Sequence, residues 1–390
     1  MAGRRGHGEG SIYQRESDGK WCAVVDLGYV NGKRKRKVIY GTTRKEVAEK
    51  MKVTLRDQQQ GLPVAVERQT VAQFLDRWLE EVVKPNRRPR TYDSYAQVAR
   101  LYLVPALGRH QLSKLAPEHV QAMMNDLLLR GGKAGQGLSP RTVQYTRAIL
   151  RKALNQAVKW GRVPRNVATL VDAPRAKKAQ IKPLTREQGQ RLLATISGHR
   201  LEGLYRVALS LGLRQGEVLG LRWEDVDLDA GTLRVAVAVQ RRKGVKELVE
   251  PKTEQSRRTL PLPAVLVAVL RAHRVRQLEE RLAMGERWHE QGLVFPSTVG
   301  TPLEPRNVTR HYKQLLKRAS LPDVRFHDLR HSCATLLVAQ GVHPRLVMEY
   351  LGHSQISLTM NTYAHVLPEA QREVASLMDT LFPAITGAGD

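Results

Sequence analysis

Apolar residues recur at helical spacing through the middle of the chain. The first such face comprises Val71, Phe74, Leu75, Trp78, Leu79 and Val82, and similar faces follow within 92–102, 120–128 and 143–158. Positions three and four residues apart share one side of a helix. We therefore expect residues 63–175 to form a helical domain, with the aromatic side chains that follow this spacing in its core.

The N-terminal part shows a different pattern. Two strand-like runs flank the pair Asn31 and Gly32, which favours a tight hairpin turn. Thr43 and Glu46 then have the spacing of a capping box at the start of a helix. We expect residues 1–62 to form a small module of one β-hairpin and one helix.

The C-terminal half is mixed. Residues 176–183 belong to a Pro- and Lys-rich stretch without periodicity, which we interpret as a linker. After it, the pattern predicts helices, strands at 233–240, 246–250 and 258–262, and helices to the end, the last of them amphipathic. The predicted fold class is multidomain α+β, in which a mixed α/β domain over 184–390 follows the hairpin-plus-helix module and the helical domain.

The charge balance indicates a polyanionic partner. The chain has 64 Lys and Arg against 37 Asp and Glu, a net charge of +27, and such an excess favours nucleic acid. The returning strand of the N-terminal hairpin and the helical segment both carry clustered basic residues. We expect DNA contacts from Lys33, Arg34, Lys35, Arg36, Lys37, Arg88, Arg90, Arg141 and Arg147. The strand residues also fit a solvated edge strand, where lysines oppose aggregation, or a nuclear localisation sequence.

The sequence lacks the features of membrane-spanning, secreted and zinc-finger proteins. The longest uninterrupted apolar run, 264–270, is too short to span a bilayer, and the basic N-terminus has no apolar stretch of a signal peptide. Cys22 and Cys333 have neither disulfide nor zinc-finger spacing. We expect a cytoplasmic, nucleoid-associated protein with no membrane partner.

Six residues of the C-terminal half form an ordered set that suits one chemistry. They are Arg214, Lys252, His327, Arg330, His353 and Tyr363. Arginines can hold the non-bridging oxygens of a phosphodiester, nitrogen bases can transfer protons, and a phenol can become the nucleophile. The set predicts covalent attack on a phosphodiester by Tyr363. Glu217, three residues after Arg214, is close enough to orient it.

A metal site is the alternative interpretation of the histidines. His327 and His331 form an H-x3-H pair. A metalloprotease helix has Glu directly after its first histidine, whereas Asp328 and Leu329 follow here. We expect neither a metal nor a cofactor.

The ordered set and its surroundings resemble the tyrosine recombinases of the phage integrase family. The strings that carry the resemblance are GLRQGE, PKTEQSRRTLPL, HDLRHSCATLL and LGHSQISLTMNTYAH. The resemblance covers 184–367 strongly and 63–175 more loosely, as a helical domain that binds core sites. Residues 1–62 resemble the arm-site-binding domain of lambda-type integrases.

This resemblance implies a site-specific recombinase that clamps duplex DNA, works as a homo-tetramer and integrates or excises a phage or other mobile element. Tyr363 would form a 3′-phosphotyrosine, His327 would handle the tyrosine's proton, and Lys252 would protonate the leaving 5′-oxygen. Charge at phosphorus would be stabilised by Arg214, Arg330 and His353. Further partners to consider are an excision factor and a host DNA-bending protein.

Three different functions stay open at this point. A type IB topoisomerase-like strand transferase shares the constellation, although the separate N-terminal module favours the integrase. A non-catalytic DNA-binding regulator on the same fold would keep the basic surface without the chemistry. A metal-dependent nuclease would also act on a phosphodiester.

Overall fold

The computed structural model describes residues 11–30, 33–59, 69–176, 182–242, 244–250 and 257–352. The chain divides into two compact units, Met1–Lys178 and Ala179–Asp390. The division falls within 176–183, the stretch interpreted above as a linker. Lys252, His353, Tyr363 and the final amphipathic helix of the prediction lie outside the described residues.

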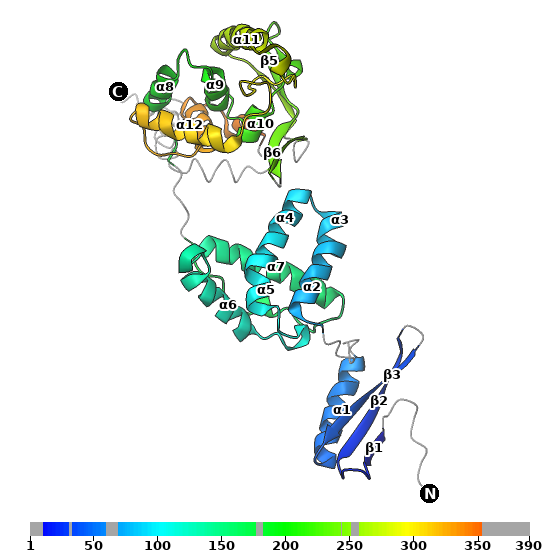
Figure 1. Cartoon of the computed structure of the whole chain (residues 1–390). Coiled ribbons are helices and arrows are strands. Elements are labelled where there is room, and N and C mark those ends of the chain that lie inside the picture. Colours follow the sequence, from blue (N-terminus) through cyan, green and yellow to red (C-terminus); the bar gives the residue numbers. More distant parts are fainter. Residues whose placement is uncertain are drawn as a thin grey trace, which may run out of the picture. The chain divides into compact units, whose positions relative to one another are not determined.

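The first unit begins with a small antiparallel sheet beside one helix (Figure 1). The elements are β1 (Ser11–Gln14), β2 (Trp21–Val30), β3 (Lys33–Gly41) and α1 (Arg44–Gln59), and β2 is the central strand. Ala23, Val25, Ile39 and Val47 form the core between sheet and helix. The sequence pattern did not predict β1, because Ile12 is the one β1 side chain packed against this core.

The predicted helix start forms with one difference. The Thr43 hydroxyl oxygen accepts from the Glu46 amide at 3.2 Å. The Glu46 carboxylate reaches the backbone N–H of Thr42, at 2.9 Å, rather than that of Thr43. The first turn is capped all the same, because both contacts satisfy amide groups at the end of the helix.

Helices make up the rest of this unit. They are α2 (Val71–Trp78), α3 (Lys84–Asn86), α4 (Pro89–Val98), α5 (Val104–Leu107), α6 (Pro117–Arg130) and α7 (Pro140–Lys159). π-helical turns at Leu79–Val83 and Ala99–Leu103 join α2 to α3 and α4 to α5, so each pair forms one long helix. Short 3-10 turns lie at Leu112–Lys114, Lys133–Gly135 and Val167–Thr169.

The apolar faces of these helices meet in one core. Trp78 and Tyr95, from different helices, stack with ring centroids 5.9 Å apart. Offset stacking of this kind adds to the stabilisation from buried area. The aromatic residues at helical spacing therefore serve as core, as their periodicity predicts.

The second unit combines helices with two small sheets. Its helices are α8 (Arg186–Thr195), α9 (Glu202–Ser210), α10 (Gln215–Leu219), α11 (Ala264–Met284), α12 (Pro305–Arg318), α13 (Asp328–Ala339) and α14 (Pro344–Leu351), with 3-10 turns at Trp223–Asp225 and Gly285–Arg287. The sheets contain β4 (Val226–Asp227), β5 (Thr232–Val235), β6 (Ala238–Arg242), β7 (Val245–Val249) and β8 (Arg258–Pro261). α9 packs against both α11 and α13 and contributes seven buried residues, so it forms the centre of this core.

The strand predicted over 233–240 is in fact two strands. β5 pairs with β4 and β8, whereas β6 pairs with β7 in a separate hairpin. The chain leaves one sheet for the other at Ala236 and Val237. The apolar residues continue through this break, so the hydrophobic pattern could not reveal it.

Two further features bear on later arguments. No helix in the described part of the chain has the length and apolar character needed to cross a membrane. Cys22 and Cys333 are both free thiols, 1% and 4% exposed, and burial raises the pKa of the Cys333 thiol to about 12.

Candidate active site

Arg214 stands at the entrance to α10 and is held there by Glu217. Its backbone N–H donates to Glu217 Oε2 at 3.0 Å, and its Nη1 donates to Glu217 Oε1 at 2.6 Å. The Glu217 side chain is 5% exposed, whereas that of Arg214 is 38% exposed. One carboxylate thus caps the helix and fixes the direction of a guanidinium that solvent can still reach.

Arg330 joins three segments of the second unit. It belongs to α13 and is 2% exposed. Its Nη1 donates to the Gly212 carbonyl at 2.9 Å and its Nη2 to the Leu351 carbonyl at 2.5 Å. The loop before α10, the first turn of α13 and the end of α14 therefore meet at one guanidinium.

Arg214 reaches the same place. Its Nη2 donates to the carbonyl of Gly352 at 3.3 Å, one residue beyond the Arg330 contact. The last carbonyls of a helix lack partners within it and carry partial negative charge. Two predicted site arginines from distant parts of the sequence thus converge on the end of α14, next to His353 in the chain.

His327 precedes α13 directly and lies beside His331, with ring centroids 5.3 Å apart. Burial of part of the ring, together with the charges of His331 and Arg330, lowers the pKa of His327 below its usual value. A neutral imidazole at pH 7 can accept a proton. His327 is thus in the state that a general base requires.

The charges of the arginine site follow from its burial. Burial and the charge of Arg214 lower the pKa of Arg330 to about 9, so its guanidinium is still protonated at neutral pH. Burial by itself would raise the pKa of Glu217. The positive charges of Arg258 and Arg214 have the larger effect, so the pKa lies below its usual value and the carboxyl group is ionised. The site is cationic around one carboxylate.

Arg258 is a site residue that the sequence analysis missed. Its side chain is 8% exposed, its Nη2 lies 3.3 Å from Glu217 Oε2, and its Nε donates to the Tyr350 carbonyl at 2.8 Å. The alternation of side chains along β8 could have revealed it. Arg258 and the buried Leu260 are two residues apart, so they share one side of the strand, and a charged side chain on a buried side is unusual unless it is paired.

The predicted DNA-contact residues lie on both parts of the first unit. Arg36 on β3 is exposed and Lys37 is half-buried, while Arg34 on the same strand pairs with Asp26 of β2. Arg88, Arg90 and Arg141 are exposed near the starts of α4 and α7, and Arg147 is half-buried. The structure says nothing of the side chains of Lys33 and Lys35.

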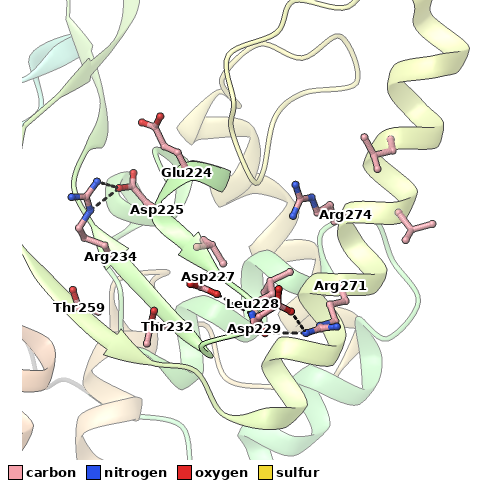
Figure 2. Close-up of a pocket in the computed structure, with 13 residues that line it drawn as sticks. Glu224, Asp225, Asp227, Leu228, Asp229, Thr232, Arg234, Thr259, Arg271 and Arg274 are labelled. Carbon is pink, nitrogen blue, oxygen red and sulfur yellow. Dashed lines mark hydrogen bonds and ion pairs between the residues drawn. The ribbon is translucent and has the colours of Figure 1, made fainter.

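A hollow elsewhere in the second unit is not this site. A groove of about 720 Å³ lies between β4, β5, β8 and α11 (Figure 2). Two ion pairs join residues of its lining, Arg234 with Asp225 and Arg271 with Asp229. The lining has four carboxylates against three arginines and none of the described residues of the predicted set, so it lacks the excess of positive charge that favours a phosphate.

A metal centre is likewise absent from the described ranges, in which no group of three or more His, Cys, Asp or Glu side chains could hold an ion. Lys252, His353 and Tyr363 lie outside those ranges, so the contacts of the predicted acid and nucleophile stay predictions.

Two family models and two relatives of known class match large parts of this chain. The model described as "Phage integrase family" matches residues 182–370, and that of the "Phage integrase, N-terminal SAM-like domain" matches residues 70–128. A "Tyrosine recombinase XerC-like" protein of Caldanaerobacter subterraneus subsp. tengcongensis is 34% identical over 90% of this chain and 93% of its own length. An integrase of Streptomyces ambofaciens is also 34% identical, over 98% of both chains.

Solved structures share the fold. An integrase of the Tn1549 transposon, in complex with a circular intermediate DNA, is similar with a TM-score of 0.67 and 21% identity, over 79% of this chain and 99% of that one. A lambda integrase dimer bound to a core site gives a TM-score of 0.55 and 18% identity, over 92% and 96% of the two chains.

Proposed function

The chain belongs to the phage integrase family, and on that basis we propose that its arginine-lined site cuts and rejoins DNA through a covalent tyrosine intermediate. It is a tyrosine recombinase, an enzyme that breaks and rejoins DNA strands at specific sites. The main support for the proposed site is a pair of hydrogen bonds immediately before His353. Arg330 donates to the carbonyl of Leu351 and Arg214 to that of Gly352.

The proposed reaction begins at Tyr363. Its oxygen attacks phosphorus, and its proton passes to neutral His327. The bond to the 5′-oxygen breaks, Lys252 protonates that oxygen, and a 3′-phosphotyrosine forms. The incoming 5′-hydroxyl of a second strand reverses these steps, so the phosphodiester bond energy is kept. Arg214, Arg330 and His353 stabilise the charge that grows on the non-bridging oxygens.

The same proposal assigns roles to the parts of the chain. Residues 1–62 bind arm-type sites, 63–175 bind core sites, 176–183 link the units, and 184–390 carry the chemistry. Four copies act together on duplex DNA in the cytoplasm, with an excision factor and a host DNA-bending protein as accessory partners. A lambda integrase of the same fold forms a tetramer bound to a Holliday junction, which supports this assembly.

Replacing Tyr363 with Phe tests the nucleophile. Tyr363→Phe should abolish the covalent adduct and leave DNA binding nearly unchanged, because only the attacking oxygen is lost. The measurement is a duplex nicked near the cleavage point, which traps the adduct for a denaturing gel. It should carry the core site found in the DNA that flanks the gene.

A persistent shifted band with Tyr363→Phe would move the nucleophile elsewhere. Adduct formation should also survive EDTA, which separates this mechanism from that of a metal-dependent nuclease. Strand exchange between two marked duplexes then distinguishes a recombinase from a topoisomerase, which only relaxes supercoils.

A further inference from the structure

Three arginines, rather than the predicted two, hold the end of α14. Arg258 donates to the Tyr350 carbonyl at 2.8 Å, Arg330 to that of Leu351 at 2.5 Å and Arg214 to that of Gly352 at 3.3 Å. Consecutive carbonyls thus each receive one guanidinium, from β8, α13 and the start of α10. Cations at a helix C-terminus are stabilising because they oppose its dipole.

Arg258 shares its second contact, the carboxylate of Glu217, with Arg214. Its Nη2 lies 3.3 Å from Glu217 Oε2, and Glu217 Oε1 accepts from Arg214 Nη1 at 2.6 Å. The side chains of Arg258 and Glu217 are 8% and 5% exposed. Both therefore lie behind Arg214, which is the solvent-accessible member of this chain of ion pairs.

The balance of charge in this group suits the reaction. Arg214, Arg258 and Arg330 face the single carboxylate of Glu217, which leaves an excess of two positive charges among these four described groups. A phosphodiester carries one negative charge, and a second develops as the tyrosine oxygen attacks. Fixed charges that match the transition state accelerate the chemical step more than they tighten ground-state binding.

We propose that Arg258 is a positioning residue for strand cleavage. Its side chain ties Glu217 to the end of α14. This link fixes Arg214, and it also fixes the start of the segment that carries His353 and Tyr363. The proposal rests on the tyrosine-recombinase function assigned above. Arg258 acts through these neighbours and does not touch DNA. Its loss should therefore slow the chemistry at saturating protein and leave affinity for DNA almost unchanged.

Two substitutions at Arg258, each with a matched control, test this role. Arg258→Gln should slow formation of the covalent adduct on the nicked core-site duplex by ~10-fold or more, because misplacing a catalytic group costs this much or more. Arg258→Lys should rescue little, since one ammonium cannot donate in a fork to Glu217 and the Tyr350 carbonyl together. The dissociation constant for the duplex should stay within ~3-fold of wild type in both variants.

The control is Arg257→Gln, which removes the same charge one residue away. The Arg257 side chain is 55% exposed and pairs with Glu250 at 2.7 Å, so the adduct rate at saturating protein should match wild type. A double variant, Arg258→Gln with Glu217→Gln, should react within ~3-fold of Glu217→Gln alone, because both substitutions break one linkage.

The outcomes separate the two proposals. Wild-type protein that forms no adduct would overturn the proposed function itself. An active wild type with full rates in either Arg258 variant would overturn the positioning role, as would a loss confined to DNA affinity. If Arg258→Gln fails to fold, Arg258→Lys decides alone, since it keeps the buried charge.

Discussion

The two arginines of the site have different environments, which the amino-acid sequence does not reveal. Arg214 and Arg330 bear the same charge, yet one is 38% exposed at its side chain and the other is 2% exposed overall. A buried guanidinium acts in a medium of lower dielectric, where each charge counts for more. The sequence could name both residues, but only the folded chain distinguishes their surroundings.

The lowered pKa of His327 leads to a prediction about pH. An unperturbed histidine is half-protonated near pH ~6.5, and a protonated His327 cannot accept the tyrosine's proton. Because the folded pKa lies lower, cleavage should hold its rate as the pH falls from 8 to ~6.5 and decline only below that value. The measurement is the rate of adduct formation at subsaturating protein across this range.

His331→Gln is the companion variant for this measurement. The charge of His331 helps to lower the pKa of His327, so its removal should shift the acid limb toward higher pH. An acid limb already above pH ~6.5 in wild type, or one that moves down in the variant, would contradict this account.

At the scale of elements, periodicity was a sound guide to helices and a weaker one to strands. Apolar residues at helical spacing marked the helices of the first unit because each buries one stripe of its surface. The run through β5 and β6 gave no such information, since apolar residues continue from Val235 to Val239 while the sheet changes between them. The alternation in β8 indicated that Arg258 faces the core, but its partners, Glu217 and the Tyr350 carbonyl, belong to distant segments that the strand pattern does not identify.

The approach of α14 to the loop before α10 makes Gly212 intolerant of a side chain. Gly212 has φ of +59°, and an added Cβ would lie 2.4 Å from Leu351 Cδ2. Gly212→Ala should lower the free energy of unfolding by ~2 kcal/mol or more, because a left-handed backbone and a clash add together. It should also displace the carbonyl that Arg330 contacts, so cleavage should slow too. Chemical denaturation measures the first effect and adduct formation the second.

Gly341→Ala serves as the control. This glycine, just after α13, has φ of +76° and nothing within 4 Å of an added Cβ, so the substitution should cost only the backbone term of ~1 kcal/mol. Equal losses of stability in the two variants would show that α14 yields to the new methyl group.

At the scale of the whole molecule, the net charge of +27 should dominate binding to DNA. Each phosphate neutralised releases ~0.9 counterion, so affinity should fall steeply as salt rises. Deleting residues 1–62 should flatten this slope and remove arm-site binding, yet leave cleavage of core sites intact. Titrations of both proteins at several salt concentrations measure the slope.

Loss of core-site cleavage in the shortened protein would instead make the N-terminal module part of the catalytic fold. An unchanged slope would mean that the basic residues of β3 are solvated and bind no phosphate.

The burial of both native cysteines has a practical consequence for watching this enzyme at work. Thiol reagents attack the exposed thiolate, and Cys22 and Cys333 offer neither exposure nor, at Cys333, an accessible ionised form. A maleimide dye should thus attach only to cysteines introduced on purpose. Leu129 and Leu282, 76% and 82% exposed in different units, provide a donor–acceptor pair, so single-molecule fluorescence could compare the distance between the two units with and without DNA, without first removing any native thiol.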